Sequence, residues 1–356
     1  MRNPICKVIL STCLLSSTAI TAIGQSTQEN TTKCQSADPD AKIAGCTALI
    51  QADQDTIKNR ALIYGSRGVG YYKKGEYDHA IQDTAQAIHL NPDEPSFYYT
   101  SGLAYKKKEN FDQAIQAFDE AIRLSPKFER AYYDRGNAYI DKDEYDRAIQ
   151  DFNEAIRLNP HNANNYNNRG VAYQRWGDND RAIENYNQAI SLNPNDVTTY
   201  FNRGSVYFAE SNLIAAASDF KRTIAAAPSS SSAVYSALFL HIIMKRKGME
   251  DAQQLARVAA AADLSKWPGP LLKLYQGQLT AAEAMKATTG GISDLHKYQV
   301  CQANYFSGED ALLHHYTTAA VVYFRAARDG CPGGATYRAI AAAEMKRLVP
   351  STGSAN

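Results

Sequence analysis

The sequence has almost no net charge. Its 38 lysine and arginine residues are balanced by 37 aspartate and glutamate residues, which gives a formal charge of +1. This balance argues against a general binder of nucleic acid or of membrane surfaces. The seven histidines form no HExxH pattern, and the chain has neither a phosphate-binding loop nor a nucleophile elbow. We therefore expect no metal, no cofactor and no enzymatic activity.

Long apolar runs are also scarce, and the one at the N-terminus has the features of an export signal. Two basic residues precede the apolar run 8–23, and small residues follow at a plausible cleavage site. We expect residues 1–24 to be a signal peptide and the mature chain to be periplasmic or secreted. Retention of this segment as a membrane anchor is the alternative. No later stretch is long enough to cross a bilayer, so we expect no integral span after signal removal.

Cysteine is rare as well. Removal of the signal would leave four cysteines, Cys34, Cys46, Cys301 and Cys331. An even number in an exported chain suggests disulfide bonds, for which three pairings are possible. Closeness in sequence favours Cys34–Cys46 and Cys301–Cys331. No pair has the close spacing of a zinc knuckle, and free buried thiols are the other alternative.

The dominant feature of the chain is a unit of 34 residues that is repeated five times between residues 61 and 230. Each unit has a glycine near its start, an alanine twelve residues later and a proline twelve residues after that. The marker glycines are Gly68, Gly102, Gly136, Gly170 and Gly204. Apolar residues recur at spacings of three and four on both sides of a polar turn, which predicts two amphipathic helices per unit. One such pair cannot bury its apolar face alone, so the pairs must stack.

A period of 34 residues with these marks is similar to the tetratricopeptide repeat (TPR). The resemblance implies an all-α fold, a right-handed superhelical solenoid of antiparallel helix pairs. The five units are 61–94, 95–128, 129–162, 163–196 and 197–230. Around them we expect a capping half-repeat at 25–60, an irregular helical region at 231–300, a sixth TPR-like unit at 301–334, a capping helix at 335–349 and a flexible tail at 350–356.

A second pattern links the two helices of a unit. The residue before the marker glycine is arginine in four units, and an acid or amide follows sixteen residues later. In the remaining unit Ser101 replaces the arginine and Ala117 replaces the acid. We predict structural bridges for the pairs Arg67–Asp83, Arg135–Asp151 and Arg203–Asp219, because arginine has the fork geometry that such pairs need. A direct role of these arginines in binding is the alternative.

The resemblance also implies a binding face, because the first helix of each TPR pair lines a concave groove. Mapped onto this chain, the groove is rich in aromatic and amide residues and carries positive charge. Its residues would be Lys73, Tyr99, Lys107, Tyr133, Asn137, Asn167, Asn168, Arg175, Phe201 and Asn202. Amides suit an extended peptide backbone, and aromatic rings supply apolar contact. The residue set with which some TPR domains hold a C-terminal carboxylate is missing here, so we do not predict binding of chaperone tails.

The second half has a more specific resemblance. The segments Trp267-Pro268, Leu274-Tyr275-Gln276-Gly277 and 301–308 are similar to exported bacterial TPR proteins, among them periplasmic adaptors that bring proteases and cell-wall hydrolases to their substrates. The resemblance implies a non-enzymatic scaffold or adaptor of the cell envelope that binds a protein or peptide segment. The alternatives are a hydrolase with a site in 265–315 and a structural subunit of an envelope complex. The oligomeric state remains open.

Overall fold

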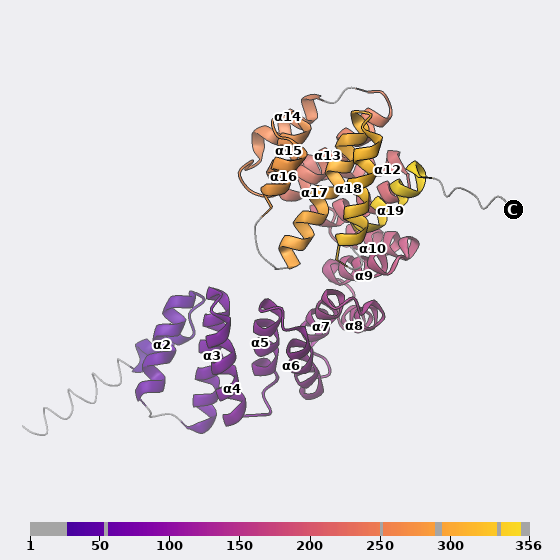
Figure 1. Ribbon diagram of the computed structural model, residues 1–356. Helices are drawn as coiled ribbons and strands as arrows, with labels where there is room; N and C mark the ends of the chain where they lie inside the picture. The colour runs from indigo at the N-terminus through magenta and orange to yellow at the C-terminus, as the bar shows by residue number, and fades with distance from the viewer. Residues whose placement is uncertain (1–26, 53–55, 250–251, 289–293, 333–335, 350–356) are drawn as a thin grey trace, which may run out of the picture. The chain divides into compact units, whose positions relative to one another are not determined.

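The computed structural model of the protein describes residues 27–52, 56–249, 252–288, 294–332 and 336–349. Across these ranges the regular secondary structure is helical, without a strand (Figure 1). The predicted all-α class is confirmed. No helix in these ranges combines the length and the hydropathy that a membrane span needs. The expected signal segment 1–24 and the tail 350–356 lie outside the described residues.

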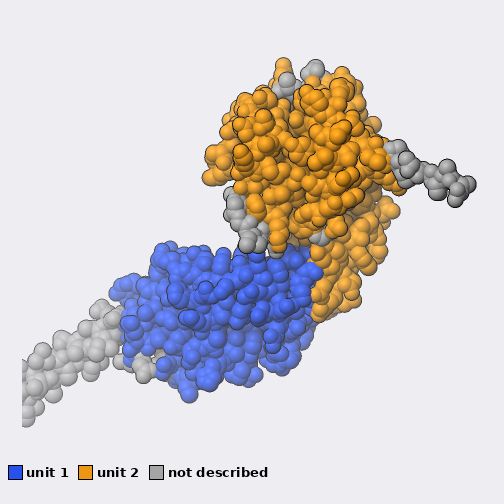
Figure 2. All heavy atoms as spheres, viewed as in Figure 1, with its two compact units in different colours: residues 1–142 blue, residues 143–356 orange. Residues whose placement is uncertain are grey.

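The chain divides into two compact units, residues 1–142 and residues 143–356, which are coloured blue and orange in Figure 2. The first unit contains α2 (Pro39–Ala52), α3 (Ile57–Lys74), α4 (Tyr77–Leu90), α5 (Pro95–Lys107), α6 (Phe111–Leu124) and α7 (Glu129–Asp141). Here α3 packs on α4 and α5 packs on α6, and each pair contacts the next helix in the chain. The first unit is therefore a stack of helix pairs.

The second unit contains three further pairs with the same packing, α9 on α10, α11 on α12 and α17 on α18. Its helices are α8 (Tyr145–Leu158), α9 (Ala163–Trp176), α10 (Asn179–Leu192), α11 (Val197–Ala209), α12 (Leu213–Ala226), α13 (Ser231–Arg246), α14 (Ala252–Ala261), α15 (Gly269–Tyr275), α16 (Ala281–Lys286), α17 (Asp294–Leu313), α18 (Thr317–Gly330) and α19 (Thr336–Leu348). The short helices α14 to α16 belong to the region that the sequence marks as irregular.

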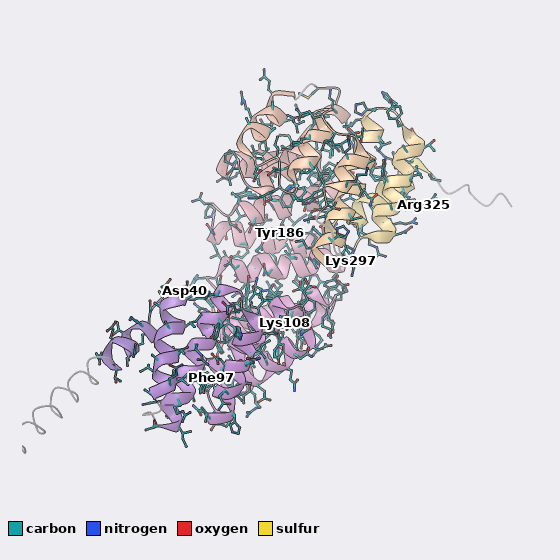
Figure 3. All side chains as sticks on the ribbon, turned by 60° about the vertical axis from the view of Figure 1, so that its left-hand side comes forward. Asp40, Phe97, Lys108, Tyr186, Lys297 and Arg325 are labelled. Carbon is teal, nitrogen blue, oxygen red and sulfur yellow. A yellow bond between two sulfur atoms is a disulfide. The ribbon has the colours of Figure 1, made fainter. Side chains whose placement is uncertain are left out.

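The marker glycine lets the two helices of a pair approach closely. A Cβ atom on Gly170 would lie only 2.7 Å from the ring of Tyr186, which is fully buried on α10 (Figure 3). In the region 301–334 a Cβ atom on Gly308 would lie equally close, 2.7 Å, to the ring of Phe324. Any larger residue would push the second helix away from its partner. The glycine and the aromatic residue sixteen positions later therefore form one packing unit, which the last pair shares.

The turn inside each pair also repeats. Seven residues after each marker glycine the backbone enters the left-handed region, with φ between 60° and 93°. These turn residues are Gly75, Glu109, Asp143, Gly177, Ser211 and His315. Four of them are not glycine, so their backbone conformation is strained. The pair α13–α14 has the same turn at Gly248, and His241 occupies its marker position.

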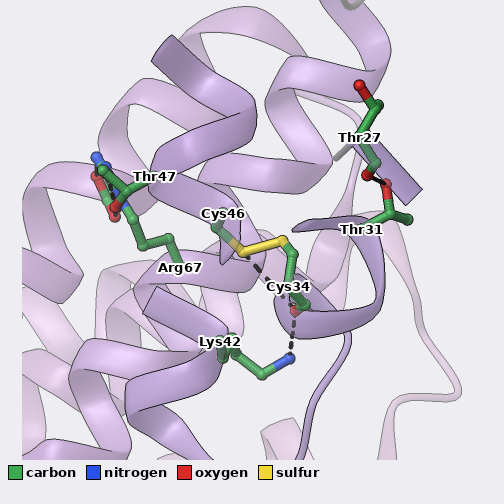
Figure 4. The surroundings of a disulfide bond; sticks show 8 residues. Thr27, Thr31, Cys34, Lys42, Cys46, Thr47 and Arg67 are labelled. Carbon is green, nitrogen blue, oxygen red and sulfur yellow. Dashed lines mark hydrogen bonds and ion pairs between the residues drawn. A yellow bond between two sulfur atoms is a disulfide. The ribbon is translucent and has the colours of Figure 1, made fainter. Parts of the chain in front are cut away.

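The N-terminal region is held by a disulfide bond between Cys34 and Cys46, as Figure 4 shows. Lys42 Nζ donates to the carbonyl oxygen of Cys34 at 2.9 Å and adds a second link. Residues 27–34 are helical and precede α2. A helix pair thus stands where the sequence suggests a half-repeat. The first of these helices is not predicted, because the polar residues 27–33 lack the apolar periodicity that would reveal a helix.

The C-terminal helices share one core with the last repeats. Its centre contains the buried rings of Phe239 on α13, Tyr305 and Phe306 on α17 and Tyr337 on α19. The disulfide Cys301–Cys331 joins α17 to the residue that follows α18. Both favoured cysteine pairings are therefore confirmed. The expected capping helix is α19, and it contacts α11 and α17 as well as its neighbour α18.

A buried ion cluster ties this core together. Arg246 Nη2 on α13 donates to both carboxylate oxygens of Glu309, at 2.8 and 2.7 Å, and to Glu344 Oε1 at 2.8 Å. The Tyr305 hydroxyl donates to Glu309 Oε1 at 3.0 Å. Burial raises the pKa of Glu309, which is 0% exposed, while the charge of Arg246 opposes that rise. Helices α13, α17 and α19 therefore share one partly buried cation, whose side chain is 21% exposed.

Candidate partner-binding face

The first helices of the repeats form a surface that we call the first-helix face. In the first unit it consists of α3, α5 and α7. The Tyr99 hydroxyl donates to Asp134 Oδ2 at 2.8 Å, and Lys106 Nζ donates to Asp134 Oδ1 at 3.2 Å. The Tyr99 ring packs on Phe128, with ring centroids 4.9 Å apart. Burial and the Asp134 carboxylate raise the pKa of Tyr99 well above its ordinary range. Tyr99 thus joins neighbouring repeats.

The predicted lysines of this face are exposed. Lys73 lies in the last turn of α3, and Lys107 is the last residue of α5. Burial, and to a smaller extent the charge of Lys73, lowers the pKa of Lys42. Tyr133 and Asn137 lie half-buried on α7. The first-helix face of this unit therefore presents cationic side chains beside half-buried aromatic and amide groups.

In the second unit the predicted asparagines form a hydrogen-bonded row. Asn167 Oδ1 on α9 accepts from Asn202 Nδ2 on α11 at 3.1 Å and from Thr199 Oγ1 at 3.1 Å. Asn167 Nδ2 donates to Asn168 Oδ1 at 2.9 Å. This row links two successive first helices. Asn168 and Asn202 remain half-buried, whereas Asn167 is buried.

Helices from the C-terminal region lie against the first-helix face of the second unit. Helix α19 contacts α11, and α17 contacts α13. Gln174 Nε2 on α9 donates to Thr336 Oγ1 on α19 at 2.7 Å. Between these helices remains a cavity of about 240 Å³, which we call the aromatic pocket. It is lined by Val171, Gln174, Arg175, Phe201, Asn202, Ser205, Ser231, Ser232, Tyr235, Phe239, Tyr298, Gln302, Thr336 and Tyr337.

One wall of the aromatic pocket is fixed by a hydrogen-bond network. The Tyr235 hydroxyl donates to Gln302 Oε1 at 2.7 Å. Trp267 Nε1 donates toward both groups, at 2.9 Å from the Tyr235 oxygen and 2.8 Å from Gln302 Oε1. Burial raises the pKa of Tyr235 well above its ordinary range, so its hydroxyl keeps its proton at neutral pH. The network joins three separate parts of the chain, and two of its members, Tyr235 and Gln302, line the cavity.

Two of the arginines before the marker glycines make a bidentate contact with the second helix of their own repeat. Arg203 Nε and Nη2 donate to the two oxygens of Asp219, each at 2.8 Å. Arg67 makes the same bidentate contact with Asp83, at 2.7 and 2.8 Å. Hydrogen bonding to Asp219 raises the pKa of Arg203. Such forked pairs fix the separation and the register of two helices.

One other repeat shows a variant of this contact, and another shows a separate contact with the preceding second helix, which Arg169 and Arg203 also make. Arg169 Nε donates to the amide oxygen of Asn185 at 2.8 Å, and burial lowers the pKa of Arg169, which has no carboxylate there. Arg135 Nη1 donates to Asp119 Oδ1 in the preceding second helix at 2.5 Å. Asp151 belongs to the other compact unit, so its pairing with Arg135 stays a prediction.

Family models match the central part of the chain. The models described as tetratricopeptide repeat match residues 99–163 and 152–184, and the model described as TPR repeat matches residues 68–109 and 175–210. These ranges join into one stretch from 68 to 210. Residues 68–210 are tetratricopeptide repeats. They coincide with units in which two helices, a marker glycine and a left-handed turn recur.

Solved TPR structures are also similar to this chain. The pilF protein of Pseudomonas aeruginosa is 17% identical, with a TM-score of 0.52, over 62% of this chain and 99% of that one. MamA is 28% identical, with a TM-score of 0.42, over 45% of this chain and 93% of its own. YrrB, described as a TPR protein with an unusual peptide-binding site, is 20% identical, with a TM-score of 0.44, over 54% and 96%. No curated protein matches the sequence.

Beyond the matched TPR units lies a second cavity, of about 560 Å³, which we call the polar pocket. Its lining is His241, Lys245, Leu255, Tyr275, Gln276, Asp310, Leu313 and His314. His314 Nδ1 lies 3.5 Å from Asp310 Oδ1, and burial raises the pKa of Asp310 while the charge of His314 lowers it. The lining contains no serine, threonine or cysteine that could act as a nucleophile. An acid and a histidine could still activate water there.

The TPR pattern alone could not reveal the full aromatic pocket. Arg175, Phe201 and Asn202 come from the repeats, whereas Tyr298, Gln302 and Tyr337 come from the C-terminal helices. Only Gln302 lies in a segment that the sequence singles out, the run 301–308. The positions of Tyr298 and Tyr337 depend on how α17 and α19 pack against distant repeats, which local periodicity does not encode.

Proposed function

We propose that the protein is a non-enzymatic scaffold or adaptor of the bacterial cell envelope that binds a segment of a partner protein on its first-helix face. TPR units stack into extended surfaces suited to such binding. The two disulfide bonds are consistent with an exported chain. The resemblance to periplasmic adaptors adds the role of bringing a protease or a cell-wall enzyme to its substrate.

The observation that carries this proposal is the mixture of groups on the first-helix face of the second unit. Asn202 presents an amide, Phe201 an aromatic ring and Arg175 a cation toward one cavity. Amides pair with an extended backbone, rings bury apolar side chains, and the cation sets orientation. In the first unit the exposed Lys73 and Lys107 extend the same chemistry.

The test places a photo-crosslinking amino acid at single positions of the mature chain. Lys107 and Asn202 sample the first-helix face of each unit, and the exposed Arg123 and Glu184 on second helices serve as matched controls. We expect one envelope protein to crosslink from the face positions and a peptide of that protein to compete. Equal crosslinking from the control positions would show that the face assignment is wrong.

A charge-reversal variant adds a test that spares the fold. Tyr99 is unsuitable for truncation because its hydroxyl and ring hold neighbouring repeats together. Lys73→Glu combined with Lys107→Glu changes exposed charges only. We expect weaker partner binding with unchanged thermal unfolding if the first unit contributes. Unchanged binding would restrict the binding face to the second unit.

The polar pocket supports a second candidate, a hydrolase in which Asp310 and His314 activate water. The specific observation is the raised pKa of a carboxyl group beside a histidine in a cavity. Purified protein would be assayed against ester and peptide substrates, with Asp310→Asn as the variant. Hydrolysis that Asp310→Asn abolishes would favour the enzyme. No hydrolysis, or hydrolysis that the variant retains, would remove this candidate.

A further inference from the structure

Arg175 differs from the arginines that precede the marker glycines. Arg67 and Arg203 each form an ion pair with a carboxylate in the neighbouring helix. Arg175 forms no ion pair or hydrogen bond with any described residue, although its charge lowers the pKa of Tyr298 against the larger effect of burial. It is half-buried and lines the aromatic pocket. A half-buried guanidinium without an anion retains an unmet preference for one.

Among the described residues, the rest of the pocket lining offers no carboxylate to meet that preference. Arg175 is the one charged residue among the fourteen that line the cavity. The polar lining instead supplies hydroxyl groups from Ser231, Ser232 and Thr336 and an amide from Asn202. Hydroxyl and amide groups can donate to an anion as readily as they accept from a cation. The electrostatic balance of the cavity therefore favours a ligand with one negative charge.

The apolar part of the lining limits the size of the ligand. The rings of Phe201, Phe239 and Tyr337 line the cavity, and Val171 adds an aliphatic side chain. A cavity of roughly 150 Å³ suffices for benzene, and drug-sized ligands need roughly 300 Å³ or more. The volume of about 240 Å³ lies between these limits. It fits one aromatic or branched side chain together with a carboxylate.

We propose that the aromatic pocket is a binding site for a single carboxylate carried on an aromatic or branched apolar body of one side chain's volume. Arg175 holds the carboxylate, and the rings enclose the apolar body. The ligand is a free small carboxylate or the last residue of a polypeptide. Because a small carboxylate needs no partner protein, the site goes beyond the proposed scaffold function.

The site also differs from the groove positions with which some TPR domains hold a carboxylate. Those positions belong to first helices alone, and this chain lacks that residue set. Here the cavity exists because Tyr298 and Gln302 on α17 and Thr336 and Tyr337 on α19 close over α9 and α11. The pocket therefore depends on the C-terminal helices, which share a core with the last repeats.

The first experiment uses the unaltered mature chain and isothermal titration calorimetry. The probes are 3-phenylpropionate and its uncharged amide, which share one apolar body. We expect the acid to bind at least about tenfold more tightly than the amide, because a charged hydrogen bond is worth about 1.5–3 kcal/mol. Equal affinities, or no saturable binding of the acid at millimolar concentration, would overturn the proposal.

Variants then assign the charge preference to a residue. Arg175→Gln should remove the difference between acid and amide, and Arg175→Lys should restore part of it. Arg157→Gln is the matched control. Arg157 is an exposed arginine of the same compact unit, residues 143–356, and it pairs with Glu154 outside the pocket. Retention of the full acid preference in Arg175→Gln would overturn the assignment. Circular dichroism verifies that each variant is folded.

A final comparison separates the two sources of the carboxylate. A hexapeptide that ends in free phenylalanine is titrated beside 3-phenylpropionate and beside the same peptide with an amidated end. Tighter binding of the free-ended peptide than of the small acid identifies a chain terminus as the ligand. Tighter binding of the small acid identifies a free metabolite. Equal binding of the free and amidated peptides would exclude the chain terminus. The crosslinking position Lys107 is not part of the pocket lining, so it tests the scaffold function whichever source is found.

Discussion

Replacement of Asp219 by asparagine should destabilise the repeat 197–230. The preceding repeat, which has an asparagine at the equivalent position, allows the size of the effect to be estimated. Asp219 is 6% exposed at its side chain and Arg203 is 18% exposed, so both charges are largely removed from water. In the neighbouring unit Arg169 and Asn185 show the outcome of such a replacement, a single hydrogen bond at 2.8 Å to a neutral amide. We expect Asp219→Asn to cost about 1–2 kcal/mol, because a charge-assisted bidentate contact becomes a neutral one.

Three further variants, Asp219→Ala, Arg203→Ser and the double change, complete a double-mutant cycle. Asp219→Ala should cost about 3 kcal/mol, since it leaves the Arg203 guanidinium partly buried beside no anion. The double change Arg203→Ser with Asp219→Ala reproduces the natural pair Ser101 and Ala117, and it should cost less than the sum of the single changes by about 1–3 kcal/mol.

The assay must resolve single units, because stacked repeats need not unfold in one step. Urea denaturation gives the global change in free energy, and hydrogen exchange of α11 and α12 gives the local one. The expected result is faster exchange in these two helices for each single variant. Two results would show that the bridge does not stabilise the repeat. One is an unchanged hydrogen-exchange rate and urea midpoint in Asp219→Asn. The other is a loss of unfolding free energy in the double variant equal to the sum of the two single losses.

Three other predictions concern the backbone and the core. Ser211→Gly should stabilise the protein by about 0.5–1 kcal/mol in thermal unfolding, because Ser211 has φ of 61° and glycine relieves that strain; a loss of stability would contradict this. Gly170→Ala should cost about 1–3 kcal/mol in urea denaturation, since the new methyl group meets the Tyr186 ring, and a neutral effect would show that α10 can shift freely. Cys301→Ser should lower the free energy of unfolding by about 3–4 kcal/mol under oxidising conditions, because the bond closes a loop over a separation of 30 residues. Under reducing conditions, which serve as the control, the same substitution should change nothing.

The repeats were predictable because each carries its own local information. Helix periodicity, the marker glycine and the proline after the second helix all lie within 34 residues, so one unit explains the others. The same locality makes the spacing of Arg203 and Asp219 recognisable in the sequence alone. Equivalent positions can be compared across five repeats, which a single helix pair would not allow.

The aromatic pocket was only partly predictable, for the opposite reason. Arg175 and Phe201 occupy repeat positions that the family pattern marks, but Tyr298 and Tyr337 reach the same cavity from helices far along the chain. Their placement results from the core around Phe239 and the disulfide Cys301–Cys331, both of which are long-range. The helix at 27–34 was missed because its residues are polar and its support comes from Cys34.

The positions of the disulfides have a consequence for how the chain acquires them. Cys34 and Cys46 are 12 residues apart and precede the repeats, and no cysteine lies between Cys46 and Cys301. A chain that crosses a membrane with its N-terminus first exposes the early pair to oxidant while the late pair is still behind. Once the early bond has closed, only one partner is left for Cys301. For a chain exported in this direction, the order of emergence would reduce the three possible pairings of these four cysteines to one, without an isomerase to correct mistakes.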